Sequence, residues 1–136
     1  MGARRLLAVA AAWSFAATAA AAAPCPELQG AATVASAEGF RISYRLDPKT
    51  PAVSEAFALE LSVCGPSGAY EGPFRVDADM PAHRHGMNYR PTVTPVAPGR
   101  FRADGMVLHM QGDWRFTFEA ATADGPVRLT ADYRQP

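Results

Sequence analysis

The chain has 136 residues, with 13 Lys and Arg against 13 Asp and Glu, 49% hydrophobic residues, 12 Pro, 11 Gly and two Cys. This length fits one domain and leaves little room for a second. A formal charge of zero at pH 7 excludes the basic surface of a general nucleic-acid binder and the strongly acidic composition of a solvating tail.

The first 22 residues are typical of an export signal. Arg4 and Arg5 precede an apolar, alanine-rich run over residues 6–23, which ends in the small residues that signal peptidase requires. We expect cleavage between Ala22 and Ala23, so that residues 23–136 form a periplasmic or secreted domain. An uncleaved membrane anchor stays open as an alternative, because the run is about long enough to cross a bilayer at roughly 20 residues.

Cleavage at this point removes two basic residues and no acidic residue. The remaining 11 basic and 13 acidic residues give a net charge of −2 with neutral histidines. Such a mildly acidic surface gives no reason to expect nucleic acid as a partner, or a membrane once the signal is removed.

Both cysteines, Cys25 and Cys64, lie after the expected cleavage site. An even number of cysteines in an oxidising compartment predicts one disulfide, here closing a loop of about 40 residues. Metal binding by the two thiolates is the alternative, but the sequence has no CxxC spacing to support it. A lipoprotein with Cys25 as the lipidated residue also stays open, although Pro24 does not suit that processing.

Beyond residue 23 the chain reads as short strands and turns. No stretch keeps a helical period for three turns, whereas apolar and polar residues alternate, as in half-buried strands. The alternating stretches are residues 40–46, 57–63, 74–80, 108–118 and 127–131, and two further short strands are expected near residues 92–96 and 100–103.

Turn-forming pairs separate these strands, among them Asp47-Pro48, Gly65-Pro66 and Pro98-Gly99. About seven strands in roughly 110 residues predict an all-β fold, an immunoglobulin-like antiparallel β-sandwich, with a small barrel as the alternative. Trp114 is expected to be its central core aromatic residue.

Every histidine and every methionine after the expected cleavage site lies within a single 31-residue stretch. These seven side chains are Met80, His83, His85, Met87, Met106, His109 and Met110. Imidazole nitrogen suits copper, zinc and nickel, whereas soft thioether sulfur selects Cu(I). A donor set of His and Met without thiolate suits a copper carrier in an oxidising space.

The spacing of the donors supports a shared site. His83 and His85 point the same way if the segment is extended, and Gly86 lets the loop bend so that Met87 returns to the same point. His109 would arrive from another strand. We therefore predict a metal site formed by His83, His85, Met87 and His109, with Met80 and Met110 as further ligands.

Each donor also has an ordinary structural explanation. Met80 and Met110 continue inward-facing alternations and are more readily core residues than ligands, and Met106 is expected to pack in the core. His109 is expected to face outward, where a lone histidine is usually solvated. If the end of the strand finishing at Met80 meets the start of the strand beginning near Met110, the loop over residues 83–87 caps them both.

Signals for an enzyme are weak. The sequence contains no GxSxG, HExxH, P-loop or GxGxxG motif. His83 or His85 could pair with Asp77 or Asp79 as an acid and base, but carboxylates on the polar face of a strand are usually solvated. We expect no catalytic activity.

Three segments carry a family resemblance. They are Ala78–Met87, which contains Met80-Pro81, then Gly99 with Phe101, and then Gly105–Trp114, which contains Met110-x-Gly112-x-Trp114. Together they resemble the YtkA-like domain family, which is similar to the periplasmic part of FixH-like proteins. The resemblance covers roughly residues 38–120.

The resemblance implies an immunoglobulin-like sandwich outside the cytoplasmic membrane. Members of the family are often linked with copper handling or with assembly of haem–copper oxidases, and the resemblance carries no catalytic residues. We expect no retained transmembrane anchor here, which departs from FixH-like proteins.

The sequence therefore predicts an exported domain that binds copper, most readily Cu(I), and carries it to a copper-receiving or oxidase-assembly protein. The alternative is a metal-free interaction or assembly module, in which the Met- and His-rich loop is a protein contact surface. An adhesin or structural domain of the cell envelope is a third possibility.

Overall fold

A computed structural model describes residues 2, 14 and 16–136 of the chain. Most of the predicted signal peptide, residues 1–22, lies outside the described residues. In the described part, no helix is long and apolar enough to span a membrane.

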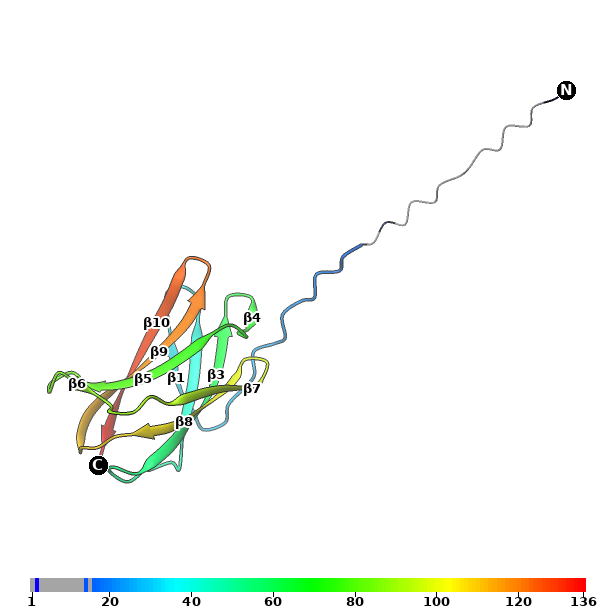
Figure 1. Cartoon of the computed structure of the whole chain (residues 1–136). Helices are drawn as coiled ribbons and strands as arrows, with labels where there is room; N and C mark the ends of the chain where they lie inside the picture. Colours follow the sequence, from blue (N-terminus) through cyan, green and yellow to red (C-terminus); the bar gives the residue numbers. More distant parts are fainter. Residues whose placement is uncertain (1, 3–13, 15) are drawn as a thin grey trace.

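The described residues form ten strands and no helix, arranged as two antiparallel sheets (Figure 1). The first sheet has the order β1-β2-β3-β8-β7, with β4 paired to β3: β1 (Ala32–Ala35), β2 (Arg41–Asp47), β3 (Ala56–Gly65), β4 (Gly68–Ala69), β7 (Thr92–Ala97) and β8 (Arg100–Val107). The second sheet has the order β10-β9-β5-β6: β5 (Phe74–Met80), β6 (His85–Gly86), β9 (Gly112–Thr122) and β10 (Gly125–Gln135).

The predicted all-β sandwich is confirmed, with ten strands instead of about seven. The three additional strands, β1, β4 and β6, have only four, two and two residues, which is too short for a visible alternation. The strand predicted over residues 108–118 is wrong at its start. Here β8 continues to Val107, and residues 108–111 connect the two sheets before β9 begins.

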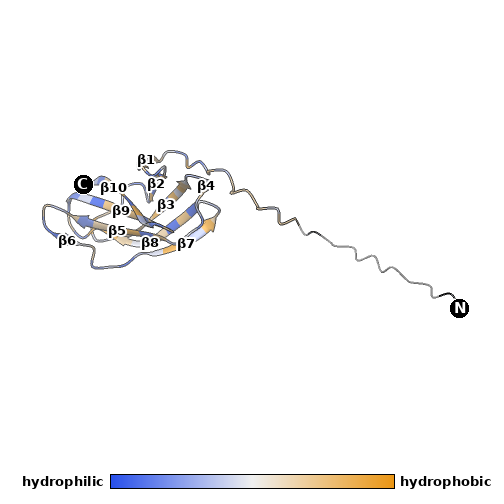
Figure 2. Ribbon diagram, turned by 90° about the horizontal axis from the view of Figure 1, so that it is seen from above, coloured by the Kyte–Doolittle hydropathy of each residue, from blue (hydrophilic) through white to orange (hydrophobic). Residues whose placement is uncertain are grey.

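Alternation places the core between the two sheets. Along β5, Phe74, Val76, Ala78 and Met80 are buried, whereas Arg75 and Asp77 are exposed. Hydropathy colouring of the strands shows this change between hydrophobic and hydrophilic residues (Figure 2). Trp114 is 1% exposed and lies in this core, as predicted.

The predicted disulfide between Cys25 and Cys64 is present and joins the N-terminal segment to the end of β3. Main-chain contacts extend this attachment, since the Ala69 N–H of β4 donates to the Ala23 carbonyl at 2.8 Å. The segment around Cys25 is thereby fixed against the first sheet.

Candidate metal centre

The predicted ligands come from two places that the fold brings to one end of the sandwich. The first is the hairpin of β5 and β6, in which Met80 is directly opposite His85. Its turn is closed by the His83 N–H, which donates to the Met80 carbonyl at 3.0 Å. The Met87 N–H then donates to the Ala78 carbonyl at 3.0 Å, so residues 80–87 double back beside the end of β5.

The second place is the connection over residues 108–111, which carries His109 and Met110. It leads directly into β9, and β9 pairs with β5 up to Asp79 opposite Arg115. The start of β9 therefore lies beside the end of β5. The approach is close: a Cβ built on Gly112 would be 3.0 Å from the Met80 Cε.

The three imidazoles form a row. The ring centroids of His83 and His85 are 5.7 Å apart, and those of His85 and His109 are 5.1 Å apart. His109 also packs edge-on against Trp114 at 5.3 Å, and His85 does so at 6.1 Å. The structure thus brings together His85 and His109, which are 24 residues apart in the sequence.

Trp114 fixes the connection that carries His109. Its indole N–H donates to the Met110 carbonyl at 3.0 Å, and its ring forms a wall beside both His85 and His109. The sequence suggested Trp114 only as a core residue. The signal for this second role is the Met110-x-Gly112-x-Trp114 spacing, which places the indole four residues after the carbonyl that it binds.

Two of the three imidazoles have a buried nitrogen without a hydrogen-bond partner among the described residues. The Nδ1 atoms of His85 and His109 are both buried, and neither makes a hydrogen bond within the described residues. A buried polar atom without a partner costs roughly 1–3 kcal/mol. Two imidazoles that bind one ion through bonds of about 2.0–2.1 Å have ring centres about 5–6 Å apart. The observed 5.1 Å between His85 and His109 fits that arrangement.

His83 is placed differently from the other two histidines. It is exposed on the hairpin turn, whereas His85 and His109 are half-buried. The expectation that His109 faces outward from a strand is wrong, because residue 109 lies on the connection between the sheets and not on a strand.

The methionines occupy a range of depths. Met106 is fully buried in the core, as predicted, and Met80 is 1% exposed. Met87 is half-buried and packs against the core cluster. Met110 was expected to be a core residue from its phase with Trp114, but it is 37% exposed, because the alternation does not continue through the connection. Thioethers therefore occur both inside this end of the sandwich and on its surface.

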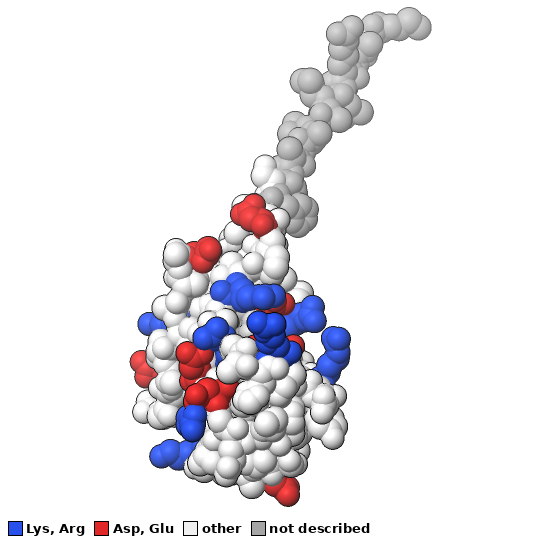
Figure 3. Space-filling model, turned by 90° about the vertical axis from the view of Figure 1, so that its left-hand side faces the viewer, with Lys and Arg blue, Asp and Glu red and all other residues white. Residues whose placement is uncertain are grey.

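The nearby charged side chains pair with one another on the outer face of the second sheet. Arg115 donates to the Asp132 carboxylate at 2.8 Å, and this hydrogen bond raises the pKa of the Arg115 guanidinium. Side chains alternate along β9, so Arg115 and Trp114 lie on opposite faces. Viewed from the left-hand side of Figure 1, the surface has positive and negative groups interspersed over one part and few charged groups over another (Figure 3).

The acid–base pairing considered for Asp77 and Asp79 is not formed with a histidine. The Asp77 carboxylate accepts a hydrogen bond from the Ala78 N–H at 2.8 Å, and no salt bridge within the described residues joins either aspartate to His83 or His85. In the part of the chain that is described, no three His, Cys, Asp or Glu side chains are grouped to hold a metal. The donors gathered here are imidazoles and thioethers.

Gly112 holds Met80 and the start of β9 in contact, and its substitution should disturb both. Its φ of +124° is one that L side chains rarely adopt, and a new Cβ would press on the Met80 Cε. We expect Gly112→Ala to lower the free energy of unfolding by about 1–3 kcal/mol and to shift the Met80 ε-methyl NMR signal. Urea unfolding and a methyl spectrum measure the two effects.

Gly125→Ala is the matched control, since Gly125 also has a positive φ, +109°, but no atom within 4 Å of its built Cβ. It should cost similar stability without moving the Met80 signal. An unchanged Met80 methyl signal in Gly112→Ala would contradict the described contact.

Comparison with protein-family models, with curated proteins and with solved structures found no match to this chain.

Proposed function

We propose that this protein is an exported copper carrier that binds Cu(I) at the end of the sandwich formed by the β5–β6 hairpin and the connection over residues 108–111. His85 and His109 are the nitrogen ligands, and thioethers complete the site. The observation that carries the proposal is the pair of buried, unpartnered Nδ1 atoms on imidazoles whose centroids are 5.1 Å apart.

The donor chemistry favours Cu(I) over the other metals that imidazole accepts. Met80 is opposite His85 on the paired strand, and Met87 follows His85 by two residues. Thioether sulfur is a soft ligand that suits Cu(I) and is rarely chosen by zinc. Both cysteines are joined in the disulfide, so thiolates do not compete for the ion.

The positions of His83 and Met110 favour a copper carrier over a copper-storage protein. Both are exposed at the rim next to the half-buried pair, where they are able to contact an incoming or departing ion. The receiving molecule would be a copper-binding or oxidase-assembly protein outside the cytoplasm. The disulfide supports that location, because disulfides persist in oxidising compartments.

The resemblance to the YtkA-like domain family agrees with this proposal. The β-sandwich is the fold that this resemblance implies. Membership of the family remains a prediction from the sequence segments given above.

A competition titration tests the proposal. The purified, disulfide-bonded protein is titrated with Cu(I) under anaerobic conditions against a coloured chelator, and then with Zn(II) in the same way. We expect one equivalent of Cu(I) to be withdrawn from the chelator and zinc to be bound more weakly. His83→Ala/His85→Ala should lose most of the Cu(I) affinity. Equally weak competition by the wild type and by this variant would end the carrier proposal.

A metal-free interaction module is the second candidate function. It is favoured by large apolar side chains on the surface, namely Tyr89 and Val96, each 58% exposed. The same titration separates the two functions, since a module of this kind would leave the chelator loaded.

A further inference from the structure

His85 is the middle ring in the row of three imidazoles. Its ring centroid lies 5.1 Å from that of His109 and 5.7 Å from that of His83. Both separations suit two imidazoles on one ion, which places their ring centres about 5–6 Å apart. The proposed copper site uses the pair of His85 and His109. The pair of His83 and His85 is equally well spaced, and that site does not use it.

The two nitrogens of His85 have different surroundings. The Nδ1 is buried and has no hydrogen-bond partner among the described residues. The Nε2 is not one of these buried atoms, and it takes part in no side-chain hydrogen bond of the described chain, so it faces solvent. The nitrogens of an imidazole are distinct and point to different sides of the ring. His85 therefore offers one nitrogen to the interior and the other to the rim.

The hairpin turn fixes the main chain of His83 and leaves its side chain free. The His83 N–H donates to the Met80 carbonyl at 3.0 Å, and Arg84 follows with a φ of 55°. The His83 ring is exposed and makes no hydrogen bond with another described side chain or main-chain group. It is therefore able to turn a nitrogen toward an ion held on the Nε2 of His85.

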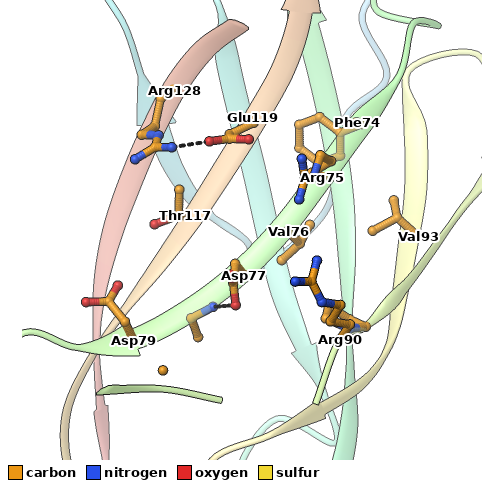
Figure 4. Close-up of a pocket in the computed structure, with 13 residues that line it drawn as sticks. Phe74, Arg75, Val76, Asp77, Asp79, Arg90, Val93, Thr117, Glu119 and Arg128 are labelled. Atoms are coloured by element: carbon orange, nitrogen blue, oxygen red, sulfur yellow. Dashed lines mark hydrogen bonds and ion pairs between the residues drawn. The ribbon is translucent and has the colours of Figure 1, made fainter. Parts of the chain in front are cut away.

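The nearest carboxylate of β5 points away from these two rings. Met80 is directly opposite His85, and Asp79 is opposite Gly86. Side chains directly opposite each other on paired strands share a face of the sheet, so His85 lies on the inner face with Met80. Successive side chains alternate, so Asp79 lies on the outer face, where it borders the hollow beside β5 (Figure 4). An ion between His83 and His85 is therefore held by imidazole nitrogen, and water completes its coordination.

A single proton prevents His85 from serving two ions at once. Neutral imidazole has one N–H and one bare nitrogen, and only the bare nitrogen binds a metal ion. With an ion on Nδ1 the proton is on Nε2, and with an ion on Nε2 the proton is on Nδ1. As long as the ring keeps that proton, an ion on one side of His85 excludes an ion on the other side.

We infer that His83 and the Nε2 of His85 form a second, outer metal site, which takes a divalent ion of the kind that imidazole prefers. Among such ions Cu(II) binds nitrogen ligands most tightly, so it is the probe of choice. The inference rests on the proposed function for its inner site, where the Nδ1 of His85 and thioethers hold Cu(I). The two sites share His85 and are filled one at a time, and neither is filled through electron transfer. An ion that comes from solvent meets the outer site first.

Titration of the full-length, disulfide-bonded protein with Cu(II), followed by electron paramagnetic resonance, tests the outer site. We expect a Cu(II) signal with couplings to imidazole nitrogen. His83→Ala should weaken this binding by at least about tenfold, because it removes one of two protein ligands. His109→Ala, the matched imidazole control, should leave Cu(II) affinity within about threefold of the wild type. An unchanged affinity in His83→Ala, or an equal loss in both variants, would overturn the outer site.

Displacement by Ag(I) tests the sharing of His85. Ag(I) is a soft ion that suits the thioethers of the inner site, and it exchanges no electrons with Cu(II). In chloride-free buffer, one equivalent of Ag(I) should weaken Cu(II) binding by at least about tenfold in the wild type. The effect should be much smaller in His109→Ala, which lacks an inner ligand. Native mass spectrometry counts the silver that is bound.

The outcomes separate the two proposals. Uptake of Ag(I) by the wild type with full retention of Cu(II) would overturn the sharing of His85 and leave the copper carrier intact. No uptake of Ag(I) would overturn the inner site and the sharing together. The result for His83→Ala would then decide by itself whether the outer site exists.

Discussion

Replacing both His85 and His109 with alanine is expected to weaken Cu(I) binding by at least about 100-fold. Structural zinc sites gain about 10–16 kcal/mol from four ligands, so one ligand contributes roughly 3 kcal/mol, or about 100-fold in affinity. Each single variant should already show most of that loss. Anaerobic titration against a Cu(I) chelator gives the dissociation constants.

His83→Ala is the matched imidazole control. His83 is exposed, and its nitrogens are not among the buried atoms without a partner, so its removal should change affinity by about tenfold or less. Urea unfolding of every variant shows whether the fold is retained. A double variant that folds and keeps its affinity within about threefold of the wild type would place the metal elsewhere.

Removing the disulfide is expected to cause the largest loss of stability. Cys25 and Cys64 are 39 positions apart, and a cross-link over a loop of this size lowers the entropy of the unfolded chain enough to contribute about 3–4 kcal/mol. Cys25→Ser/Cys64→Ser should therefore unfold at a clearly lower urea concentration than the oxidised wild type.

Hydrogen exchange would locate this loss. The Ala69 amide, which donates to the Ala23 carbonyl, should exchange faster once the N-terminal segment is released from the first sheet. The Met87 amide, at the other end of the sandwich, should be affected only through global unfolding. A change of less than about 1 kcal/mol would contradict the role assigned to the cross-link.

The parts of the fold that were predictable from sequence are those that depend on local alternation. β5 was expected over residues 74–80 and occupies those residues, because each inward side chain is apolar and its neighbours include Arg75 and Asp77. The disulfide was predictable from an even cysteine count together with the expectation of export to an oxidising compartment. In contrast, β4 and β6 are formed by pairing with β3 and β5, which no pattern of two residues can indicate.

The candidate site was predictable in its residues but not in its geometry. The sequence singled out all three histidines, yet it assigned His109 to a strand, because Leu108 and Trp114 have the same phase. The alternation continues through residues 108–111 in the sequence, but these residues form a connection between the sheets and not a strand. Met110 is therefore exposed, and His109 lies beside His85.

In the proposed site, the Nδ1 atoms of His85 and His109 bind one Cu(I) ion. Because Cu(I) is diamagnetic, long-range ¹H–¹⁵N NMR of the imidazoles before and after one equivalent of metal observes these atoms directly. We predict that both Nδ1 signals shift together, with no comparable change at the His83 ring. Unshifted Nδ1 signals for His85 and His109 in a copper-saturated sample would contradict the proposed site.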